Sequence, residues 1–342
     1  MKYPFVIICC FLVFSCAEKE KSHQYTSVKI EKLYSDSISV RAIEIMDGVL
    51  GFAANKGVYG TIDFADGKVM TGVQKYDTII PAFRSIANTS TDFFMLSIAN
   101  PALLYKTAGN GKMEIVYKEE DSSVFYDAMT FWNDKEGIAI GDSMNGCLSV
   151  TITRDGGDTW RKLACSVLPK GVAGEGAFAA SDTNIKTIGD KTWVATTSSS
   201  IYYSPNKGRT WELFTTPIIS AKETQGIYSI DFYDENLGVA IGGDYTEPNS
   251  TNANKAITKD GGKTWQLLAD GNNPGYKSCI QFIPNSGGKD IVAVGFTGIS
   301  YSKDMGDSWT SLSKESFYTI RFLNDSIAYA GGKNGIAKLT FK

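Results

Sequence analysis

Short apolar runs separated by polar or glycine-rich turns recur along most of the chain. The stretches YDAMTFWNDKEGIAIGD (126–142) and YSIDFYDENLGVAIGGD (228–244) share one pattern, and YTIRFLNDSIAYAGG (318–332) follows it closely. Each reads as a strand, a polar turn and a second apolar strand that ends in glycine. Two further strands follow in each unit, as in AITKDGGKTWQLL (256–268). Four antiparallel strands per repeat are the pattern of a propeller blade.

An octapeptide that ends in tryptophan marks the repeat. TRDGGDTW, SPNKGRTW, TKDGGKTW and SKDMGDSW end at Trp160, Trp211, Trp265 and Trp309, which gives spacings of 51, 54 and 44 residues. Periods of this size indicate blades or solenoid units.

The first strand of every unit, counted along the chain, predicts seven blades. These strands are VRAIEI (40–45), FRSIAN (83–88), YDAMTF (126–131), GAFAAS (176–181), YSIDFY (228–233), SCIQFI (278–283) and YTIRFL (318–323).

The two ends of the chain are expected to close the ring together. The last unit has only three strands, the third being GIAKLTF (335–341), and SVKIEKLY (27–34) is a strand without a unit. Because an open ring would expose unpaired strand edges, we expect the N-terminal strand to join the last blade. The prediction is therefore all-β: one seven-bladed β-propeller with four-stranded antiparallel blades, formed by residues 27–342.

The N-terminus has the features of a targeting segment. Lys2 precedes an apolar run over residues 4–14, which is too short to span a bilayer as a helix but suits a signal peptide. The sequence VFSC resembles a bacterial lipobox, which implies cleavage before Cys16 and lipidation of that cysteine. An ordinary signal peptide cut nearby is the alternative.

The lipobox resemblance divides the start of the chain into a lipoprotein signal peptide (1–15) and a lipidated cysteine with a flexible tether (16–26). Acidic residues just after the cysteine resemble the surface-export signals of Bacteroidetes-type lipoproteins. We therefore expect a protein of the bacterial cell envelope, on the outer membrane and either periplasmic or surface-exposed, with the Cys16 lipid as its only membrane attachment.

The composition of the chain limits the partners and the kinds of reaction that can be expected. The net charge of −3 gives no reason to expect a nucleic-acid partner, since phosphate binding needs a clustered basic surface. The single histidine, His23, lies in the tether, which excludes His-dependent triads and zinc sites with histidine ligands from the folded domain. No glycine-rich phosphate loop follows a strand and opens a helix. We expect no cofactor and no metal, and no nucleotide-dependent oxidoreductase.

Three cysteines follow the predicted signal peptide and lipidation site, namely Cys147, Cys165 and Cys279. Their odd number and wide spacing argue against a disulfide framework. A single bridge between Cys147 and Cys165 remains an open alternative.

The octapeptide resembles the Asp box of the sialidase and BNR-repeat families. It lies between two strands, so it is expected to be a hairpin turn in which Asp155, Asp260 and Asp304 accept hydrogen bonds from their own turn. Its four tryptophans are expected to pack between neighbouring sheets. Copies on separate blades cannot converge on one ligand, so we interpret these aspartates as structural.

A ligand site is expected where the blades differ from one another. The starts of the first strands and the loops between second and third strands meet at the top mouth of a propeller channel. The candidates at these positions are Arg41, Arg84, Asp127, Asp142, Glu175, Tyr228, Asp244, Tyr245, Lys277 and Tyr318.

Each candidate has a plausible chemical role. Arg41 and Arg84 suit a bidentate clamp on a carboxylate. Asp127 or Glu175 would act as general acid or base, and Tyr228 or Tyr318 as proton donor or nucleophile. The remaining side chains would contribute to ligand binding. The alternative is a hydrated channel mouth lined by mutually satisfied charges.

The chain from the tether onward resembles the BNR-repeat, Ycf48-like group of bacterial propellers. FYDAMTFWND, GEGAFAAS and GGDYTEP resemble a lipoprotein branch of that group, some members of which are labelled oxidoreductases. Ycf48-like proteins are assembly factors that bind partner proteins, which implies a scaffold role. Sialidases share the Asp boxes and use an arginine triad, a Tyr–Glu pair and an aspartate. FRSI (83–86) is similar to their F/Y-R-I-P motif, although it lacks the proline. The resemblance to sialidases implies an acidic-sugar ligand.

Two functions are compatible with these observations. The first is a sialidase-like, monomeric propeller that binds an anionic glycan at the top mouth; were it an enzyme, which the sequence leaves open, it would be a glycoside hydrolase or lyase. The second is a non-catalytic, Ycf48-like assembly or scaffold protein that docks a protein partner. An open cavity ringed by Arg41, Arg84, Asp127 and Glu175 would favour the first, and a filled channel the second.

Overall fold

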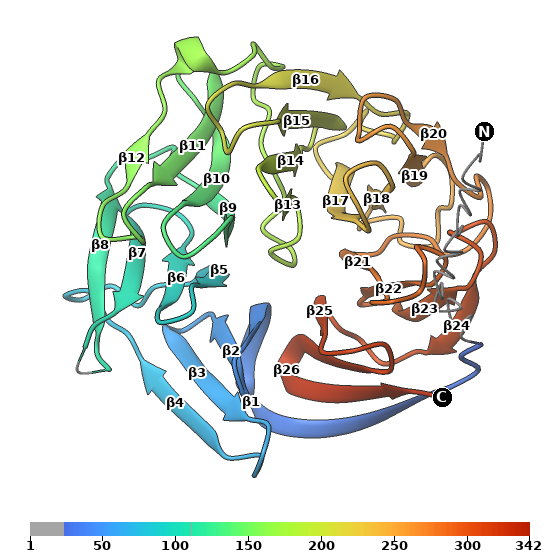
Figure 1. The fold of residues 1–342 in the computed structure, drawn as a ribbon, viewed down its shortest axis with the longest axis horizontal. Helices are drawn as coiled ribbons and strands as arrows, with labels where there is room; N and C mark the ends of the chain where they lie inside the picture. Colours follow the sequence, from blue (N-terminus) through green and yellow to red (C-terminus); the bar gives the residue numbers. More distant parts are fainter. Residues whose placement is uncertain (1–23, 110) are drawn as a thin grey trace, which may run out of the picture.

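The computed structural model describes residues 24–109 and 111–342, so the predicted signal peptide, Cys16 and His23 lie outside the described residues. Within the described part the strands form six antiparallel sheets arranged as blades around a central axis (Figure 1). The predicted all-β propeller is confirmed, but the predicted seven blades are wrong. No helix in residues 24–109 or 111–342 is long and apolar enough to cross a membrane.

The error in the blade number arises where the two ends of the chain meet. Here one six-stranded sheet replaces two of the expected units, in the order β25-β26-β1-β2-β3-β4. Its strands are β25 (Thr319–Phe322), β26 (Ile327–Phe341), β1 (Val28–Met46), β2 (Val49–Ala54), β3 (Val58–Asp63) and β4 (Val69–Val73).

Two long strands cause this fusion. The first part of β1 pairs with β26, with Val28 opposite Phe341, and its last part pairs with β2, with Met46 opposite Val49. The 19 residues of β1 continue from one expected unit into the next without a break. The stretch 335–341 is likewise the second half of β26 rather than a separate strand. The N-terminal strand does pair with the last strand of the chain, which removes the edges that an open ring would expose.

The other five blades have four strands each. In sequence order they are β5 (Phe83–Asn88), β6 (Phe93–Ser97), β7 (Ala102–Thr107) and β8 (Met113–Glu119); β9 (Tyr126–Phe131), β10 (Gly137–Met144), β11 (Cys147–Thr153) and β12 (Arg161–Lys162); β13 (Ile185–Ile188), β14 (Lys191–Ala195), β15 (Ser200–Ser204) and β16 (Glu212–Thr215); β17 (Gln225–Phe232), β18 (Gly238–Asp244), β19 (Lys255–Thr258) and β20 (Gln266–Leu267); and β21 (Cys279–Phe282), β22 (Ile291–Gly295), β23 (Gly298–Ser302) and β24 (Thr310–Ser313).

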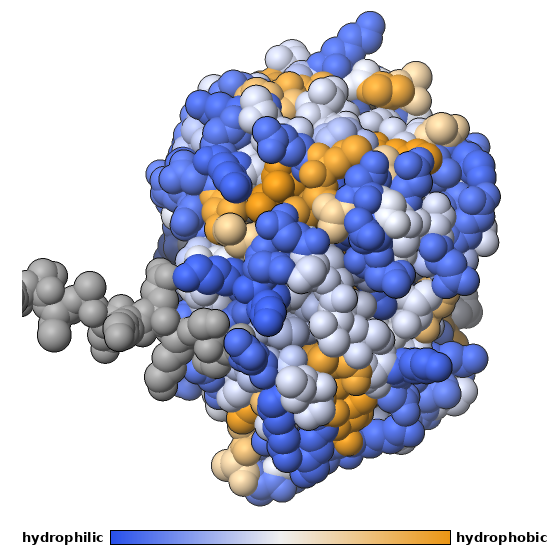
Figure 2. All heavy atoms as spheres, turned by 90° about the vertical axis from the view of Figure 1, so that its right-hand side faces the viewer, coloured by the Kyte–Doolittle hydropathy of each residue, from blue (hydrophilic) through white to orange (hydrophobic). Residues whose placement is uncertain are grey.

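The apolar core lies between neighbouring blades. One cluster, for example, joins Ile138 and Val150 of one blade to Val194 and Tyr202 of the next. On the side of the ring that carries β20 and β24, the surface is mainly hydrophilic and its apolar residues lie in separate patches (Figure 2). Each sheet is therefore buried on its faces and solvated at its outer edge, as expected for a radial arrangement.

The octapeptides form the predicted turns between third and fourth strands. In the first copy the Asp155 carboxylate accepts hydrogen bonds from the Thr159 N–H at 3.0 Å and the Thr159 hydroxyl at 2.6 Å, and Asp260 and Asp304 make the same contacts with Thr264 and Ser308. These carboxylates are occupied within their own turns, so they act in folding each hairpin.

The tryptophans that end the octapeptides stabilise the packing of blades. The Trp160 indole donates to the Gly157 carbonyl of its own turn at 3.2 Å and packs edge-on against Phe131, with ring centroids 5.7 Å apart. Gly157 has φ +81°, and a side chain there would collide with the Phe94 ring of the preceding blade. Glycine is thus needed both for the turn and for the close approach.

One predicted first strand is wrong. Residues 176–181 are not a strand, and the innermost strand of that blade is β13, which begins at Ile185. The loop that precedes β13 points toward the centre of the ring (Figure 1). We call residues 178–184 the plug, because Ser181, Asp182, Thr183 and Asn184 are all at most 5% exposed in the channel.

Asp182 connects the plug to two blades. One carboxylate oxygen accepts hydrogen bonds from the Ser85 hydroxyl at 2.9 Å and the Met129 N–H at 3.2 Å, and the other accepts from the Ile86 N–H at 3.0 Å. Burial raises the pKa of Asp182 to about 8, against the opposing effects of Arg321 and these donors. Removal of such an acceptor would leave three buried donors without a partner.

The other plug residues bond to the remaining side of the ring. The Ser181 hydroxyl donates to the Ser278 carbonyl at 2.6 Å, and the Thr319 hydroxyl donates to the Ser181 carbonyl at 2.8 Å. The Thr183 hydroxyl donates to Ser229 at 2.7 Å. The plug is therefore held by several blades at once and fills the channel.

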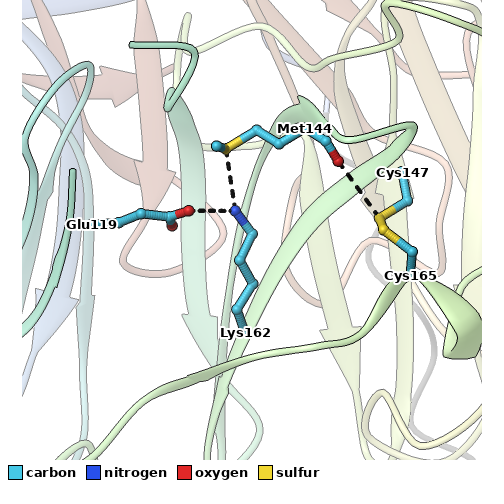
Figure 3. The surroundings of a disulfide bond; sticks show 5 residues. All are labelled: Glu119, Met144, Cys147, Lys162 and Cys165. Carbon is cyan, nitrogen blue, oxygen red and sulfur yellow. Dashed lines mark hydrogen bonds and ion pairs between the residues drawn. A yellow bond between two sulfur atoms is a disulfide. The ribbon is translucent and has the colours of Figure 1, made fainter. Parts of the chain in front are cut away.

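A disulfide stabilises the hairpin of β11 and β12. Cys147 and Cys165 form this bond, while Cys279 is free and buried. Next to the disulfide, the Lys162 ammonium contacts Glu119 of the preceding blade at 2.6 Å and the Met144 sulfur at 3.2 Å (Figure 3). The single Cys147–Cys165 bridge, which the cysteine spacing left open, is therefore formed. It anchors the segment that leads into the plug.

Replacement of Asp182 by alanine is expected to lower the free energy of unfolding by about 3–5 kcal/mol, because three buried donors lose their acceptor. Urea denaturation measures this change. Asp307→Ala, at a solvent-exposed aspartate, serves as the control and should change stability by less than about 0.5 kcal/mol. A loss under about 1 kcal/mol for Asp182→Ala would show that the plug does not depend on this carboxylate.

Reduction of the disulfide is expected to lower the free energy of unfolding by about 3 kcal/mol, given the 18-residue separation of the two cysteines and the loop entropy that the bond removes from the unfolded chain. Denaturation with and without dithiothreitol measures this. The Cys147→Ala/Cys165→Ala variant should match the reduced protein and show no response to the reductant. An equal response in both proteins would contradict the assignment.

Candidate functional site

A pocket of about 750 Å³ opens at the end of the channel where the innermost strands begin. Phe178, Ala179 and Ala180 of the plug contribute to its lining, so the plug separates the pocket from the rest of the channel. Six of the ten predicted site residues line this pocket: Arg41, Arg84, Asp142, Tyr228, Tyr245 and Tyr318. Four of these residues come from the alignment of first strands, and Asp142 and Tyr245 come from the loops between second and third strands.

Two guanidinium groups dominate the electrostatics of the pocket. Arg41 on β1 donates to the Ala180 carbonyl at 3.1 Å, and Arg84 on β5 donates to the Ala179 carbonyl at 2.8 Å. Arg41 also stacks on the Tyr318 ring, 3.9 Å from its centroid. We call Arg41 and Arg84 the arginine pair.

The arginine pair has no carboxylate partner within ion-pair distance in the described part of the chain. Burial, together with the charge of Arg41, lowers the pKa of Arg84 to about 10, so the group stays cationic at neutral pH. The Arg41 Nε is buried and has no hydrogen-bond partner among the described residues. Two half-buried cations side by side without a counter-ion favour an anionic ligand.

Aromatic side chains line the pocket beside the arginine pair. The Phe178 ring of the plug stacks on Tyr228, with centroids 3.7 Å apart, and Tyr228 packs edge-on against Tyr276 at 4.8 Å. The Tyr276 ring in turn packs against Phe296 and Tyr245, with centroid distances of 5.2 Å and 6.5 Å. We call these five residues the aromatic stripe. Its outer members, Tyr245 and Phe296, are 47% and 40% exposed.

Asp127 is enclosed beneath the pocket rather than lining it. The residue is fully buried, and neither carboxylate oxygen has a hydrogen-bond partner among the described residues. Burial and the nearby Asp142 raise its pKa well above the usual value, although Arg84 and the Ala179 N–H, which does not reach hydrogen-bonding geometry, act in the opposite direction. Burial also raises the pKa of Asp142, which accepts a hydrogen bond from the Ala177 N–H at 3.1 Å.

Glu175 is occupied by its own surroundings. Its carboxylate accepts hydrogen bonds from the Thr196 hydroxyl at 2.5 Å, the Tyr202 hydroxyl at 2.8 Å and the Val172 N–H at 3.1 Å. The side chain is 1% exposed and does not line the pocket. These contacts join the segment that leads into the plug to β15 and to the turn between β14 and β15.

Asp244 and Lys277 are likewise buried outside the lining. The hydroxyl and N–H of Thr246 hold the pKa of Asp244 at about 2, so this carboxylate stabilises the turn that presents Tyr245. Lys277 donates to the Thr297 hydroxyl at 3.0 Å and the Gly298 carbonyl at 2.8 Å, and burial lowers its pKa to about 8. This lysine therefore supports the turn that carries Phe296.

The Tyr228 hydroxyl donates to the Thr224 carbonyl at 2.8 Å, and burial raises its pKa. Lys222, at the pocket rim, contacts Asp244 at 3.7 Å and Glu247 at 2.7 Å. Among residues 24–109 and 111–342 no group of three or more His, Cys, Asp or Glu side chains is placed to hold a metal ion.

Sequence reasoning missed the plug and two members of the stripe, Tyr276 and Phe296. The run GAFAAS was read as a strand because of its apolar residues, yet its small side chains instead allow the main chain to enter the channel. A usable signal was the long stretch between β12 and β13 that lacks the alternation of a strand.

The fold and the pocket define a class: a β-propeller with a pocket at one end of a filled channel. No family model matches the chain, and no curated protein matches it in sequence. The chain resembles solved structures in its fold alone. A structure described as YCF48 bound to D1 peptide aligns with TM-score 0.66 at 12% identity, over 94% of this chain and 98% of the other.

Two further structures show the same likeness. YCF48 from Cyanidioschyzon merolae aligns with TM-score 0.62 at 13% identity, over 92% of this chain and 98% of the other. The WD40 repeats of RRP9 align with TM-score 0.64 at 10% identity, over 93% and 99%. The expected likeness to Ycf48-like propellers is thus confirmed for the fold, whereas the likeness to sialidases stays a prediction.

Asp127 makes stability depend on pH. Its raised pKa means that the native state binds more protons than the unfolded state above the unfolded value of about 4. The contribution of Asp127 to the free energy of unfolding is complete below about pH 4, and it is lost as the pH rises through the native pKa of Asp127. Asp127→Asn, which resembles the protonated acid, should therefore become more stable than the wild type by about 1 kcal/mol or more between pH 5 and pH 8.

Urea denaturation at both pH values measures this difference. Asp182 contributes the same dependence to both proteins, so the difference reports Asp127 alone. A constant difference across the range would show that the Asp127 carboxyl titrates normally.

Proposed function

We propose that this protein is a non-catalytic propeller that docks a segment of a partner protein in the pocket of the arginine pair. The observation that supports this most is the plug. It fills the channel and leaves a pocket from which the predicted acid–base groups Asp127 and Glu175 are excluded. A filled channel is the outcome that the sequence analysis associated with a partner-binding role.

The groups proposed for catalysis are committed to structure. Glu175 has three hydrogen-bond donors on its carboxylate, and the Tyr228 hydroxyl is used by the Thr224 carbonyl. A glycoside hydrolase of the common type needs two carboxyl groups that flank the scissile bond. Neither Asp127 nor Glu175 lines the pocket, so this pair does not support hydrolysis.

The shape and chemistry of the pocket suit a peptide. Its volume of about 750 Å³ is large enough for a few residues of an extended chain. Gly174, Gly176, Ala177, Ala179 and Ala180 line it with small side chains, so another main chain can approach closely. The arginine pair supplies charge-assisted donors for a carboxylate. One propeller of the same fold is described as bound to a peptide.

The cellular setting is proposed from sequence alone. We propose that residues 1–15 are a lipoprotein signal peptide, that Cys16 is lipidated, and that residues 27–342 form a single monomeric domain of the cell envelope. The octapeptide turns are proposed to be Asp boxes of the BNR type. In this setting the tether (16–26) would keep the pocket near the membrane surface.

Selection of random dodecamer peptides on the full chain tests the proposal. Peptides that contain Asp or Glu should be enriched, and the Arg41→Gln/Arg84→Gln variant should bind them about tenfold to a hundredfold more weakly, since hydrogen bonds to charged groups contribute about 1.5–3 kcal/mol.

Arg161→Gln is the matched control, because Arg161 is exposed and lies outside the pocket; it should bind like the wild type. Thermal melting verifies that each variant is folded. Two results would reject the proposal: no enrichment on the wild type, or arginine-dependent binding of anionic glycans with turnover of a glycoside.

A further inference from the structure

We propose that the pocket recognises an acidic group together with a neighbouring aromatic side chain, the acid at the arginine pair and the ring on the aromatic stripe. This inference rests on the proposed peptide-docking function and names the feature that the partner segment must have.

The aromatic stripe forms a continuous row of contacting rings from the plug to the rim. Phe178 and Tyr228 stack with an interplanar angle of 3°, and Tyr228 and Tyr276 meet at 87°. Tyr276 is 4% exposed and contacts both rim residues, Tyr245 and Phe296. The buried rings hold the exposed rings from behind, so the rim is fixed in place before a ligand arrives.

The exposure of Tyr245 and Phe296 at the rim favours a ligand that would cover them. Tyr245 and Phe296 come from different loops, after β18 and after β22, yet both line the same pocket and are 47% and 40% exposed. Separate loops thus place two large exposed rings against one buried ring, Tyr276, at the edge of a cavity. Aromatic residues gathered at a cavity in this way are typical of binding hot spots.

The stripe and the arginine pair are adjacent. Arg41 lies on the Tyr318 ring at 3.9 Å, and although burial raises the pKa of the Tyr276 hydroxyl, Arg41 is near enough to act in the opposite direction. One short ligand segment can therefore contact a guanidinium and an aromatic ring together. Neighbouring residues of an extended chain are about 3.8 Å apart at their Cα atoms, which suits an acid and a ring one or two residues apart.

The same features favour a peptide over a glycan. The lining has no Asn, Gln or Trp among its members, and of its two carboxylates Asp142 already accepts the Ala177 N–H while Glu223 is exposed. Sugar hydroxyls need many paired donors and acceptors, whereas the pocket offers cations, rings, small residues and three hydroxyl side chains, those of Thr197, Ser198 and Ser220. A carboxylate and an aromatic ring need only a cation and another ring as partners, and the arginine pair and the aromatic stripe provide both.

Sequencing of the peptides selected on the full chain tests this inference. On the wild type, an aromatic residue should occur within about two positions of Asp or Glu. On the Tyr245→Ala/Phe296→Ala variant the preference for acids should remain and the preference for aromatic residues should disappear. Leu267→Ala, at a residue that is 39% exposed outside the pocket, is the control and should leave both preferences unchanged.

Fluorescence anisotropy with the most enriched peptide then measures the coupling. Replacement of its aromatic residue by alanine should weaken binding to the wild type about tenfold, and should have no further effect on the Tyr245→Ala/Phe296→Ala variant. Acidic peptides without an aromatic preference, or a preference that survives in this variant, would overturn the inference and leave the proposed function standing. Absence of any enriched peptide, or glycan binding that depends on Tyr245 and Phe296, would overturn both.

Discussion

The buried carboxylate of Asp182 is the contact on which the centre of this propeller depends. It sits in the left-handed region at φ 58° and accepts hydrogen bonds from Ser85, Ile86 and Met129 on two blades. Its own carbonyl accepts from Arg321, which also pairs with Glu44 at 3.3 Å. A single residue of the plug thereby links strands from three sheets. A buried carboxyl group without these donors would be unfavourable in this position, so the plug and the blades stabilise each other.

The plug also creates the pocket. Its carbonyl groups at Ala179 and Ala180 orient the two arginines, and its Phe178 ring starts the aromatic stripe. Without it the same side chains would face a water-filled channel, where cations are well solvated and bind anions weakly. With it, two cations and a row of rings face one pocket. The pocket on this fold thus arises from one irregular loop placed inside a regular frame.

Much of the fold could be predicted from repetition. The octapeptides marked the third turn of their blades, and β5 and β9 have the predicted bounds of residues 83–88 and 126–131. The blade number was wrong because β1 continues from its pairing with β26 into its pairing with β2, across the expected boundary. A local pattern can indicate a strand, but it contains no information on whether two neighbouring strands belong to one sheet or to two. The segment 176–181 was misread for a related reason, since an apolar run can be buried as a strand or as a loop.

The sequence by itself determined the positions of the turns, the strand segments and the residue types that differ among the blades, because these follow from local hydrogen bonding and periodicity. Arg41, Arg84, Tyr228 and Tyr318 were identified in this way and do line one pocket. Only the tertiary structure decided that Asp127 and Glu175 are withdrawn from it, and that Tyr276 and Phe296 join it. The physical reason is that burial and the partner of a side chain depend on segments distant in sequence, above all on the loop that enters the channel.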